Sequence, residues 1–397
     1  MFSSLLHLLW VCFQVLIGYN LILPLLFYFA YFLMRKKNPV QHISEVQPDY
    51  AVIVTAYEQT DNLPAVVNSL LQMNYSNFLV YVVADKCDIS NLYFTNERVI
   101  LLKPEETLGS NTRSHFYAIT RFKKAHDYLT IIDSDNLVDK DYLLKLNTFF
   151  NRGFSAVQGI RKAKNLDTTY ACLDAARDIY YHFYDGKVLF NIGSSATLSG
   201  SGMAFTVQLY KDCLEHVDVT GAGFDKVLQA AIVKKNYRIA FTDEAIVHDE
   251  KTSRSEQLIK QRARWINTWF RYAGFGFSIL IKGIRNCSRN QFLFGFVLLR
   301  PPLFIFILLS LVCLFINFFV QPFASIVWAV GFMIFIAGFF IALLHSKTDK
   351  RIYRSLINIP RFVLLQIVSL IKARKANQYS VATKHYHDNS VEELNTH

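Results

Sequence analysis

The sequence predicts an α/β domain with a mainly parallel sheet, flanked on both sides by membrane-spanning helices. Three observations support this prediction. Apolar segments are concentrated at both ends of the 397-residue chain. Between them, short apolar runs alternate with helix-like segments, which is typical of a layered α/β domain. Acidic residues follow several of these runs, and the carboxyl ends of parallel strands are where such sheets gather functional groups.

Composition favours a membrane protein over a nucleic-acid binder. Hydrophobic residues make up 52% of the chain and charged residues 18%, which is unusual for a wholly soluble protein. Lys and Arg exceed Asp and Glu by 11, an excess that suits nucleic acid, anionic lipid or an anionic substrate. Because the basic clusters lie beside apolar runs, we expect membrane lipid as a partner and no nucleic acid. The six cysteines contain no CxxC pair, so we expect neither a disulfide framework nor a zinc site.

The first segment, residues 1–38, is predicted to be a transmembrane helix. Leu5 to Met34 is nearly all apolar, longer than the roughly 20 residues that span a bilayer, and lacks a clear cleavage site. The basic cluster at residues 35–37 places the next segment in the cytoplasm by the positive-inside rule. We therefore expect a multi-pass protein of the cell (inner) membrane with a cytoplasmic central domain.

The central domain is predicted to cover residues 39–272. Its strand-like runs are residues 51–57, 78–85, 98–102 and 128–133, and its first helix-like segments are 62–73 and 112–125. Tyr57, Glu58 and Asp85 lie at strand ends, where an aromatic ring can hold a base and a carboxylate can accept from a base or a sugar hydroxyl. An ordinary turn is an equally good interpretation of Asp85 alone.

Residues 273–376 are predicted to hold interfacial helices and two further spans, at about 302–320 and 323–344. Residues 356–371 are too short to span alone and are interpreted as interfacial, although a span stays an alternative. The tail, 377–397, is polar. About three spans argue against a transporter.

The stretch LTIIDSDNLV places Asp133 and Asp135 side by side after an apolar run. Two carboxylates this close repel each other unless a cation lies between them. A solvated turn or a helix N-cap would explain the pair structurally. A hard divalent cation would explain it chemically, since Mg²⁺ prefers one or two carboxylates together with substrate phosphates.

Two later segments carry further candidates. Asp225 follows a glycine-rich loop and opens a helix-like run, so it is either a helix cap or a general base. In QRARW, Gln261 and Arg264 lie three residues apart on one helix face, next to Trp265. Arg264 can grip phosphate, and Trp265 can stack on a sugar ring, although a membrane-surface helix is also rich in Arg and Trp.

Taken in order, these motifs resemble the membrane-integrated family 2 glycosyltransferases, which include cellulose, chitin and hyaluronan synthases. The family pattern is a lone Asp, a DxD, a late acid usually written ED, and QxxRW, and the order and spacing match from about residue 50 to 270. The resemblance implies a GT-A fold, an inverting reaction, and a nucleotide-sugar donor bound with Mg²⁺ or Mn²⁺. A UDP-sugar is common in the family.

By position, the resemblance assigns five residues to the donor and metal. Tyr57, Glu58 and Asp85 bind the nucleoside. Asp133 touches the ribose or sugar of the donor, and Asp135 holds the metal.

The resemblance also assigns the catalytic and acceptor residues. Asp225 is the base, Arg264 contacts the diphosphate, and Gln261 and Trp265 line the acceptor side. The segment at residues 199–205 lies where the family has a small-residue acceptor segment.

This sequence departs from the family at ED, which becomes Phe224-Asp225 followed by Lys226. The base is kept but its usual acidic neighbour is not. His248 lies where some related enzymes offer an extra metal ligand, but a lone histidine is more often structural.

We therefore expect a sugar transferase that acts on a polysaccharide acceptor at the cytoplasmic membrane face. The alternative is addition of one sugar to a lipid-linked or glycolipid acceptor. A catalytically inactive nucleotide-sugar-binding protein would keep the fold without turnover. The sugar, the nucleotide base and the oligomeric state are not specified by the sequence.

Overall fold

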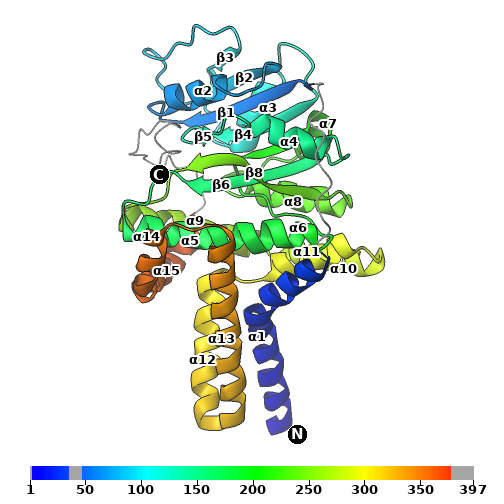
Figure 1. Ribbon diagram of the computed structural model, residues 1–397, viewed down its shortest axis with the longest axis vertical. Helices are drawn as coiled ribbons and strands as arrows, with labels where there is room; N and C mark the ends of the chain where they lie inside the picture. The colour runs from blue at the N-terminus through cyan, green and yellow to red at the C-terminus, as the bar shows by residue number, and fades with distance from the viewer. Residues whose placement is uncertain (1, 35–46, 377–397) are drawn as a thin grey trace.

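The computed structural model describes residues 2–34 and 47–376, arranged in three tiers (Figure 1). The sheet domain lies at one end, a tier of helices runs beneath it, and three long apolar helices extend from that tier. The basic cluster at 35–37, the expected boundary at residues 38 and 39, and the polar tail at 377–397 lie outside the described residues.

The described residues form one eight-stranded sheet with the order β3-β2-β1-β4-β7-β6-β8-β5. The strands are β1 (Tyr50–Tyr57), β2 (Phe78–Asp85), β3 (Val99–Leu102), β4 (Tyr128–Asp133), β5 (Leu137–Val138), β6 (Ala156–Ala163), β7 (Met203–Thr206) and β8 (Ile239–Asp249). Runs such as YAVIVTAY form buried strands because β-branched and aromatic side chains suit a pleated surface covered on both faces.

Parallel pairing brings the predicted strand ends together. Strands β1, β2, β3 and β4 pair in parallel, with Tyr57 opposite Asp85 and Thr55 opposite Asp133. Strand β7 then runs antiparallel between β4 and β6, which the sequence did not indicate. Strand β6 is parallel to β8, and β5 is antiparallel to β8. Parallel pairs are thus the majority among the described strands.

Short helices pack around the sheet and complete its core. They are α2 (Leu63–Leu71), α3 (Asn111–Ile119), α4 (Tyr142–Phe150), α7 (Val207–Leu214) and α8 (Phe224–Lys234). Their apolar faces join the strands in one continuous buried cluster, which includes Val66, Leu146 and Leu228. This core fixes the strand ends from which the site is built.

The middle tier lies roughly across the long axis of the molecule (Figure 1). It contains α5 (Thr169–Tyr181), the π-helix η1 (His182–Val188), α6 (Leu189–Asn191), α9 (Ser255–Tyr272), α10 (Gly274–Arg285), α11 (Arg289–Leu299), α14 (Lys350–Ser355), η2 (Leu356–Asn358), α15 (Ile359–Lys372) and η3 (Ala373–Lys375). Helices α10 and α11 form a close hairpin, because a Cβ at Gly283 would lie 2.4 Å from the backbone N of Phe292.

The three long helices are α1 (Phe2–Met34), α12 (Leu303–Val320) and α13 (Pro322–His345). Buried side chains fill the space between them, including Leu21, Phe306 and Phe335. Gln14 Oε1 accepts hydrogen bonds from Asn317 Nδ2 at 2.5 Å and Trp328 Nε1 at 2.8 Å, so one amide joins all three helices.

Four described segments are long and apolar enough to cross a membrane: Leu5–Met34, Leu303–Val320, Pro322–His345 and Lys350–Lys372. The first three match the expected spans closely. The fourth is interrupted by the 3₁₀ turn η2, and its second half, α15, packs along α9 in the middle tier.

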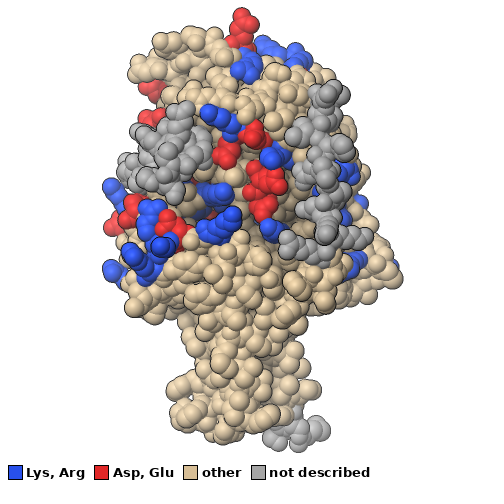
Figure 2. Space-filling view, viewed as in Figure 1, with Lys and Arg blue, Asp and Glu red and all other residues tan. Residues whose placement is uncertain are grey.

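Charged side chains follow the same division (Figure 2). On the face shown, Lys, Arg, Asp and Glu gather on the sheet domain and the middle tier, and the stalk formed by the long helices has none. Helices α12 and α13 contain no charged residue apart from the terminal His345.

Candidate active site

The carboxyl ends of β1, β2 and β4 open into a cavity of about 610 Å³. Its upper wall includes Tyr57, Asp85 and Asp133 from the three strand ends. Its lower wall comes from the middle tier and from Leu303 and Phe304, the first residues of α12. The cavity therefore extends from the sheet to the base of the apolar helices.

Asp85, the last residue of β2, is only 2% exposed. Its two carboxylate oxygens accept the backbone N–H groups of Leu108 at 2.9 Å and Gly109 at 2.8 Å. Asp85 therefore holds the loop before α3 against the strand ends, in addition to facing the cavity.

Glu58 takes a different direction from Tyr57. Its backbone has φ +61°, in the left-handed region that most side chains avoid. The carboxylate pairs with Lys86 Nζ at 2.7 Å, is 39% exposed, and does not line the cavity. Of the residues predicted to bind the nucleoside, the structure thus brings Tyr57 and Asp85 together but turns Glu58 outward.

Asp133 and Asp135 both line the cavity, and Asp135 is 7% exposed. The turn between them is held by Ser201, whose Oγ accepts from the backbone N–H of Asp133 at 3.1 Å and from Asn136 Nδ2 at 2.9 Å. Among residues 2–34 and 47–376, no group of three or more His, Cys, Asp or Glu side chains gathers to hold an ion. A carboxylate pair is nevertheless a donor set that fits Mg²⁺ or Mn²⁺, because such ions take their other ligands from water and phosphate.

His248 does not join this carboxylate pair. Its Nε2 lies 2.8 Å from Asp139 Oδ1, and its side chain is 8% exposed. It therefore connects β8 to the loop before α4, as expected for a structural histidine.

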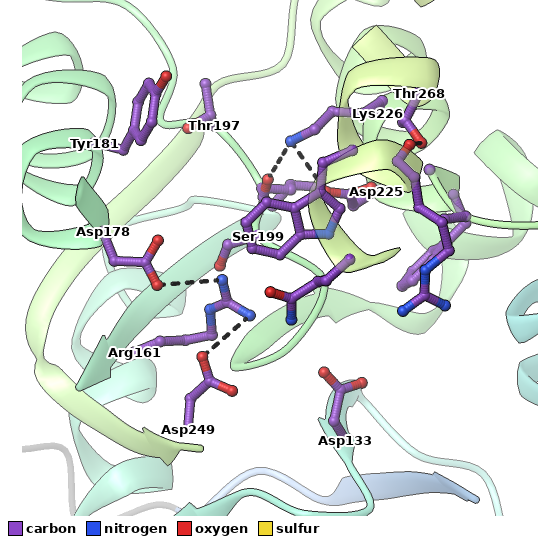
Figure 3. A pocket seen from close by; sticks show the side chains of 18 of the residues that line it. Asp133, Arg161, Asp178, Tyr181, Thr197, Ser199, Asp225, Lys226, Asp249 and Thr268 are labelled. Atoms are coloured by element: carbon purple, nitrogen blue, oxygen red, sulfur yellow. Dashed lines mark hydrogen bonds and ion pairs between the residues drawn. The ribbon is translucent and has the colours of Figure 1, made fainter. Parts of the chain in front are cut away.

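Asp225 enters the cavity from the side opposite Asp133 (Figure 3). It lies in the first turn of α8, directly after Gly223 and Phe224. Gly223 has φ +110°, and a Cβ there would lie 2.6 Å from the Tyr272 ring, so only glycine fits this turn. Lys226 Nζ lies 3.0 Å from Asp225 Oδ2 and donates to the carbonyl of Leu198 at 2.9 Å.

Helix α9 carries the three predicted QxxRW residues, and all three line the cavity. Gln261 Oε1 accepts from Thr252 Oγ1 at 3.2 Å. Burial lowers the pKa of the Arg264 guanidinium. The Trp265 ring already has cationic neighbours, with the guanidinium carbons of Arg262 and Arg177 4.1 and 4.4 Å from its centroid. Any sugar that stacks on Trp265 therefore shares the ring with them.

Comparison with known proteins identifies the family. Residues 48–268, more than half of the chain, match the model of glycosyltransferase-like family 2. The chain belongs to this family. No match was found among curated protein sequences.

Solved structures agree with a GT-A fold for this family 2 glycosyltransferase. The mannosyltransferase PcManGT from Pyrobaculum calidifontis, in complex with GDP-Man and Mn²⁺, has 13% identity and a TM-score of 0.56, over 91% of this chain and 98% of that chain. A TarS fragment from S. aureus, in complex with UDP-GlcNAc, has 14% identity over 83% of this chain and 90% of that chain, with a TM-score of 0.41 that is too low to support an inference. At 13% identity, the similarity to the mannosyltransferase shows the fold alone. Its coverage extends beyond residues 48–268, so it includes part of the flanking helices.

The glycosyltransferase cavity also contains a buried ionic network that sequence reasoning missed. Lys251 Nζ, on a side chain 2% exposed, lies 2.5 Å from Asp178 Oδ2 and 2.7 Å from Asp249 Oδ2. Arg161 lies between the same two carboxylates, at 3.9 Å from Asp178 and 3.7 Å from Asp249 (Figure 3). Burial opposes the charge of each group, but the cations hold the pKa of both carboxylates below their usual range. The network joins β6 and β8 to α5 in the tier below.

A second part of the network lies between α5 and α9. Asp174 pairs with Arg177 at 3.1 Å and with Arg262. The one sequence signal was local: Asp174, Arg177 and Asp178 recur at helical spacing within an otherwise apolar segment. Their partners, 73 and 88 positions away, left no such pattern.

Proposed function

We propose that this family 2 glycosyltransferase moves one sugar, with inversion, from a nucleotide-sugar to a hydroxyl of a lipid-linked or glycolipid acceptor. The observation that carries the proposal is one cavity whose lining includes Asp133 and Asp225 together with Leu303 and Phe304 of α12. A donor held at the strand ends and an acceptor entering from the apolar helices would meet inside it.

The chemistry assigned to Asp225 is general base catalysis. Asp225 takes the proton from the acceptor hydroxyl, the acceptor oxygen bonds to the anomeric carbon, and the bond to the donor's diphosphate breaks. Lys226, held on the Leu198 carbonyl, keeps the Asp225 carboxylate in place.

The donor is assigned to the upper wall and to Arg264 of α9 in the lower wall. Tyr57 and Asp85 line the nucleoside end, Asp133 the sugar, and Arg264 the diphosphate, whereas the outward position of Glu58 does not support a donor contact. Asp135 would hold Mg²⁺ or Mn²⁺, which neutralises the diphosphate as it leaves. A solved protein of similar fold with bound GDP-Man and Mn²⁺ supports a metal-dependent site.

The packing of the long helices favours one of the two acceptors considered above, a polysaccharide and a lipid. A polysaccharide synthase that exports its product needs an open path between its spans. The space between α1, α12 and α13 is instead filled by buried side chains, among them Phe306 and Phe335. This packing favours addition of one sugar to a lipid acceptor over synthesis of a polysaccharide.

We assign α1, α12 and α13 as spans and the sheet domain to the cytoplasmic face of the cell (inner) membrane. The fourth candidate, Lys350–Lys372, is assigned to the interface, because its α15 half packs along α9 and carries the exposed Arg361. The middle tier then lies at the membrane surface, with the cavity directly above it.

The test is Asp225→Asn in the full-length protein, assayed with a panel of nucleotide-sugars and lipid acceptors. Transfer should fall at least about a hundredfold, because the general base is lost. Donor nucleotide binding should stay unchanged. Asp243→Asn, which alters an exposed carboxylate paired with Lys187, is the matched control and should keep full transfer.

Three results would contradict parts of this proposal. Full transfer by Asp225→Asn removes the base assignment. A ladder of long products from one donor favours the polysaccharide alternative. Nucleotide binding by the unaltered protein without turnover of any donor favours the inactive binding protein.

A further inference from the structure

Helix α9 presents two adjacent stripes to the cavity. Thr268 and Tyr272 lie on the stripe that faces the Asp225 loop, where both would meet a Cβ placed on Gly223. Arg262 lies on the other stripe, between Leu258 and Ile266. Leu258 packs with Leu173 and Phe362, and Ile266 packs with Phe304. The Arg262 stripe therefore faces α5, α15 and the start of α12, which is the side of the cavity nearest the apolar helices.

Arg262 is buried with part of its hydrogen-bonding capacity unused. Its side chain is 3% exposed, and Nη2 donates to Asp174. Its Nε and Nη1 make no hydrogen bond, and neither does Nε1 of Trp269, which lies two helical turns further along the same stripe. Leaving buried donors unpaired is unfavourable by about 1–3 kcal/mol each, and more for charged groups. Both residues line the cavity, so a ligand bound there would lie beside them.

The surrounding charge favours an anion. The network around Arg262 contains the cations Arg161, Arg177, Lys251 and Arg262 and the carboxylates Asp174, Asp178 and Asp249. Cations therefore exceed carboxylates by one. Burial and the charge of Arg177 lower the pKa of Arg262 to about 10, which still leaves it charged at neutral pH.

Part of the cavity lining near Arg262 is apolar. The cavity lining includes the apolar residues Ile266, Pro302, Leu303 and Phe304, and Ile266, one turn after Arg262 on α9, packs with Phe304 in the first turn of α12. A free anion would gain little from such a wall. An anionic group attached to an alkyl chain would fill both parts, with its charge on Arg262 and its chain along α12.

We propose that Arg262 and Trp269 form a phosphate-binding subsite for the head group of a lipid acceptor. The assignment of this lipid as the acceptor rests on the proposed function, whereas the subsite itself does not. Arg262 is the second residue of QRARW, a position that the QxxRW pattern leaves open.

The test measures binding without turnover. Dodecyl phosphate would be titrated into the full-length protein in neutral detergent and followed by calorimetry, with inorganic phosphate and dodecanol as separate arms. Arg262→Met should weaken dodecyl phosphate binding about tenfold or more, as loss of a charged hydrogen-bond donor predicts. Arg361→Met is the matched control, because it removes one exposed positive charge from the neighbouring α15 and should not alter binding.

Loss of Arg262 alone leaves Asp174 with one cation fewer, which can destabilise the protein. The double variant Asp174→Asn with Arg262→Met removes both members of the pair and serves as the second test. Binding of UDP and GDP reports in each case whether the donor site is intact.

Each outcome decides a separate point. Equal dodecyl phosphate binding in Arg262→Met, the double variant and the unaltered protein overturns the subsite. Equal binding of inorganic phosphate or dodecanol overturns the lipid phosphate as ligand. Weaker nucleotide binding with unchanged dodecyl phosphate binding assigns Arg262 to the donor instead. Arg262-dependent binding together with an absence of transfer to any lipid keeps the subsite and rejects the proposed function.

Discussion

Lys251→Met should be among the most destabilising single substitutions in the sheet domain. The ammonium lies within 2.7 Å of two buried carboxylates, so its removal leaves Asp178 and Asp249 facing each other across Arg161. Breaking a buried ion pair from one side is unfavourable by roughly 3–5 kcal/mol. Because Arg161 stays within 3.9 Å of Asp178 and 3.7 Å of Asp249, we expect the lower end, about 3 kcal/mol. For a unit of about 200 residues, this corresponds to a Tm lower by about 6–12 °C.

The assay is thermal unfolding of the purified full-length protein in neutral detergent, followed by intrinsic fluorescence. Lys187→Met provides the contrast, because Lys187 pairs with Asp243 at a similar 2.6 Å but the two side chains are 32% and 45% exposed. An exposed pair contributes about 0–1 kcal/mol, so its Tm should change by only a few degrees at most. The Tm of Lys251→Arg should lie between the Tm values of Lys251→Met and Lys187→Met. Equal Tm values for Lys251→Met and Lys187→Met would refute the reasoning from burial.

Three further predictions concern Asp85 and the metal in the cavity and the buried His115 outside it. Asp85→Ala should raise the donor KM about tenfold with a smaller change in kcat, because the loop at Leu108 and Gly109 loses two charge-assisted hydrogen bonds. An unchanged donor KM in steady-state kinetics would contradict this prediction. Burial lowers the pKa of His115 to about 3, so as the pH falls through its ordinary value of 6.5 the unfolded chain binds a proton that the folded chain does not. The free energy of unfolding should therefore fall by roughly 1 kcal/mol from this group between pH 6.5 and 5.5. His115→Gln should remove that part of the pH dependence in thermal unfolding curves measured across this range. Chelation of divalent ions should abolish sugar transfer, and added Mg²⁺ or Mn²⁺ should restore it. The Asp135→Asn variant should need more metal for its half-maximal rate. Transfer that persists in the presence of chelator would exclude a role for the metal in the reaction.

The parts of the site that could be predicted from sequence are those that depend on local pattern and parallel topology. Short apolar runs marked β1, β2 and β4, and parallel pairing then required Tyr57, Asp85 and Asp133 to meet at one edge. The backbone turn at Glu58 could not be foreseen, because a positive φ in a non-glycine residue depends on the surrounding fold.

The long-range ion pairs could not be predicted from the sequence either. Lys251 and Asp178 are 73 positions apart, and Arg300 and its buried partner Asp185 are 115 apart. Nothing in the spacing of these residues indicates that they meet. The sequence did show the acids and bases of α5 at helical spacing, but it could not show that they face a cavity instead of solvent.

The hydrogen bonds of Gln14 also constrain the order in which the long helices can pack during synthesis of this protein. Its partners Asn317 and Trp328 follow it by 303 and 314 positions, so α1 leaves the ribosome long before either exists. In the proposed topology, the sheet domain is synthesised while α1 holds an amide in hydrocarbon without its final partners, which is an unfavourable state. Helix α1 therefore reaches its final packing only after α12 and α13 have been synthesised. A chain cut short before residue 303 would keep Asp133 and Asp225 and still lack both hydrogen-bond partners of Gln14.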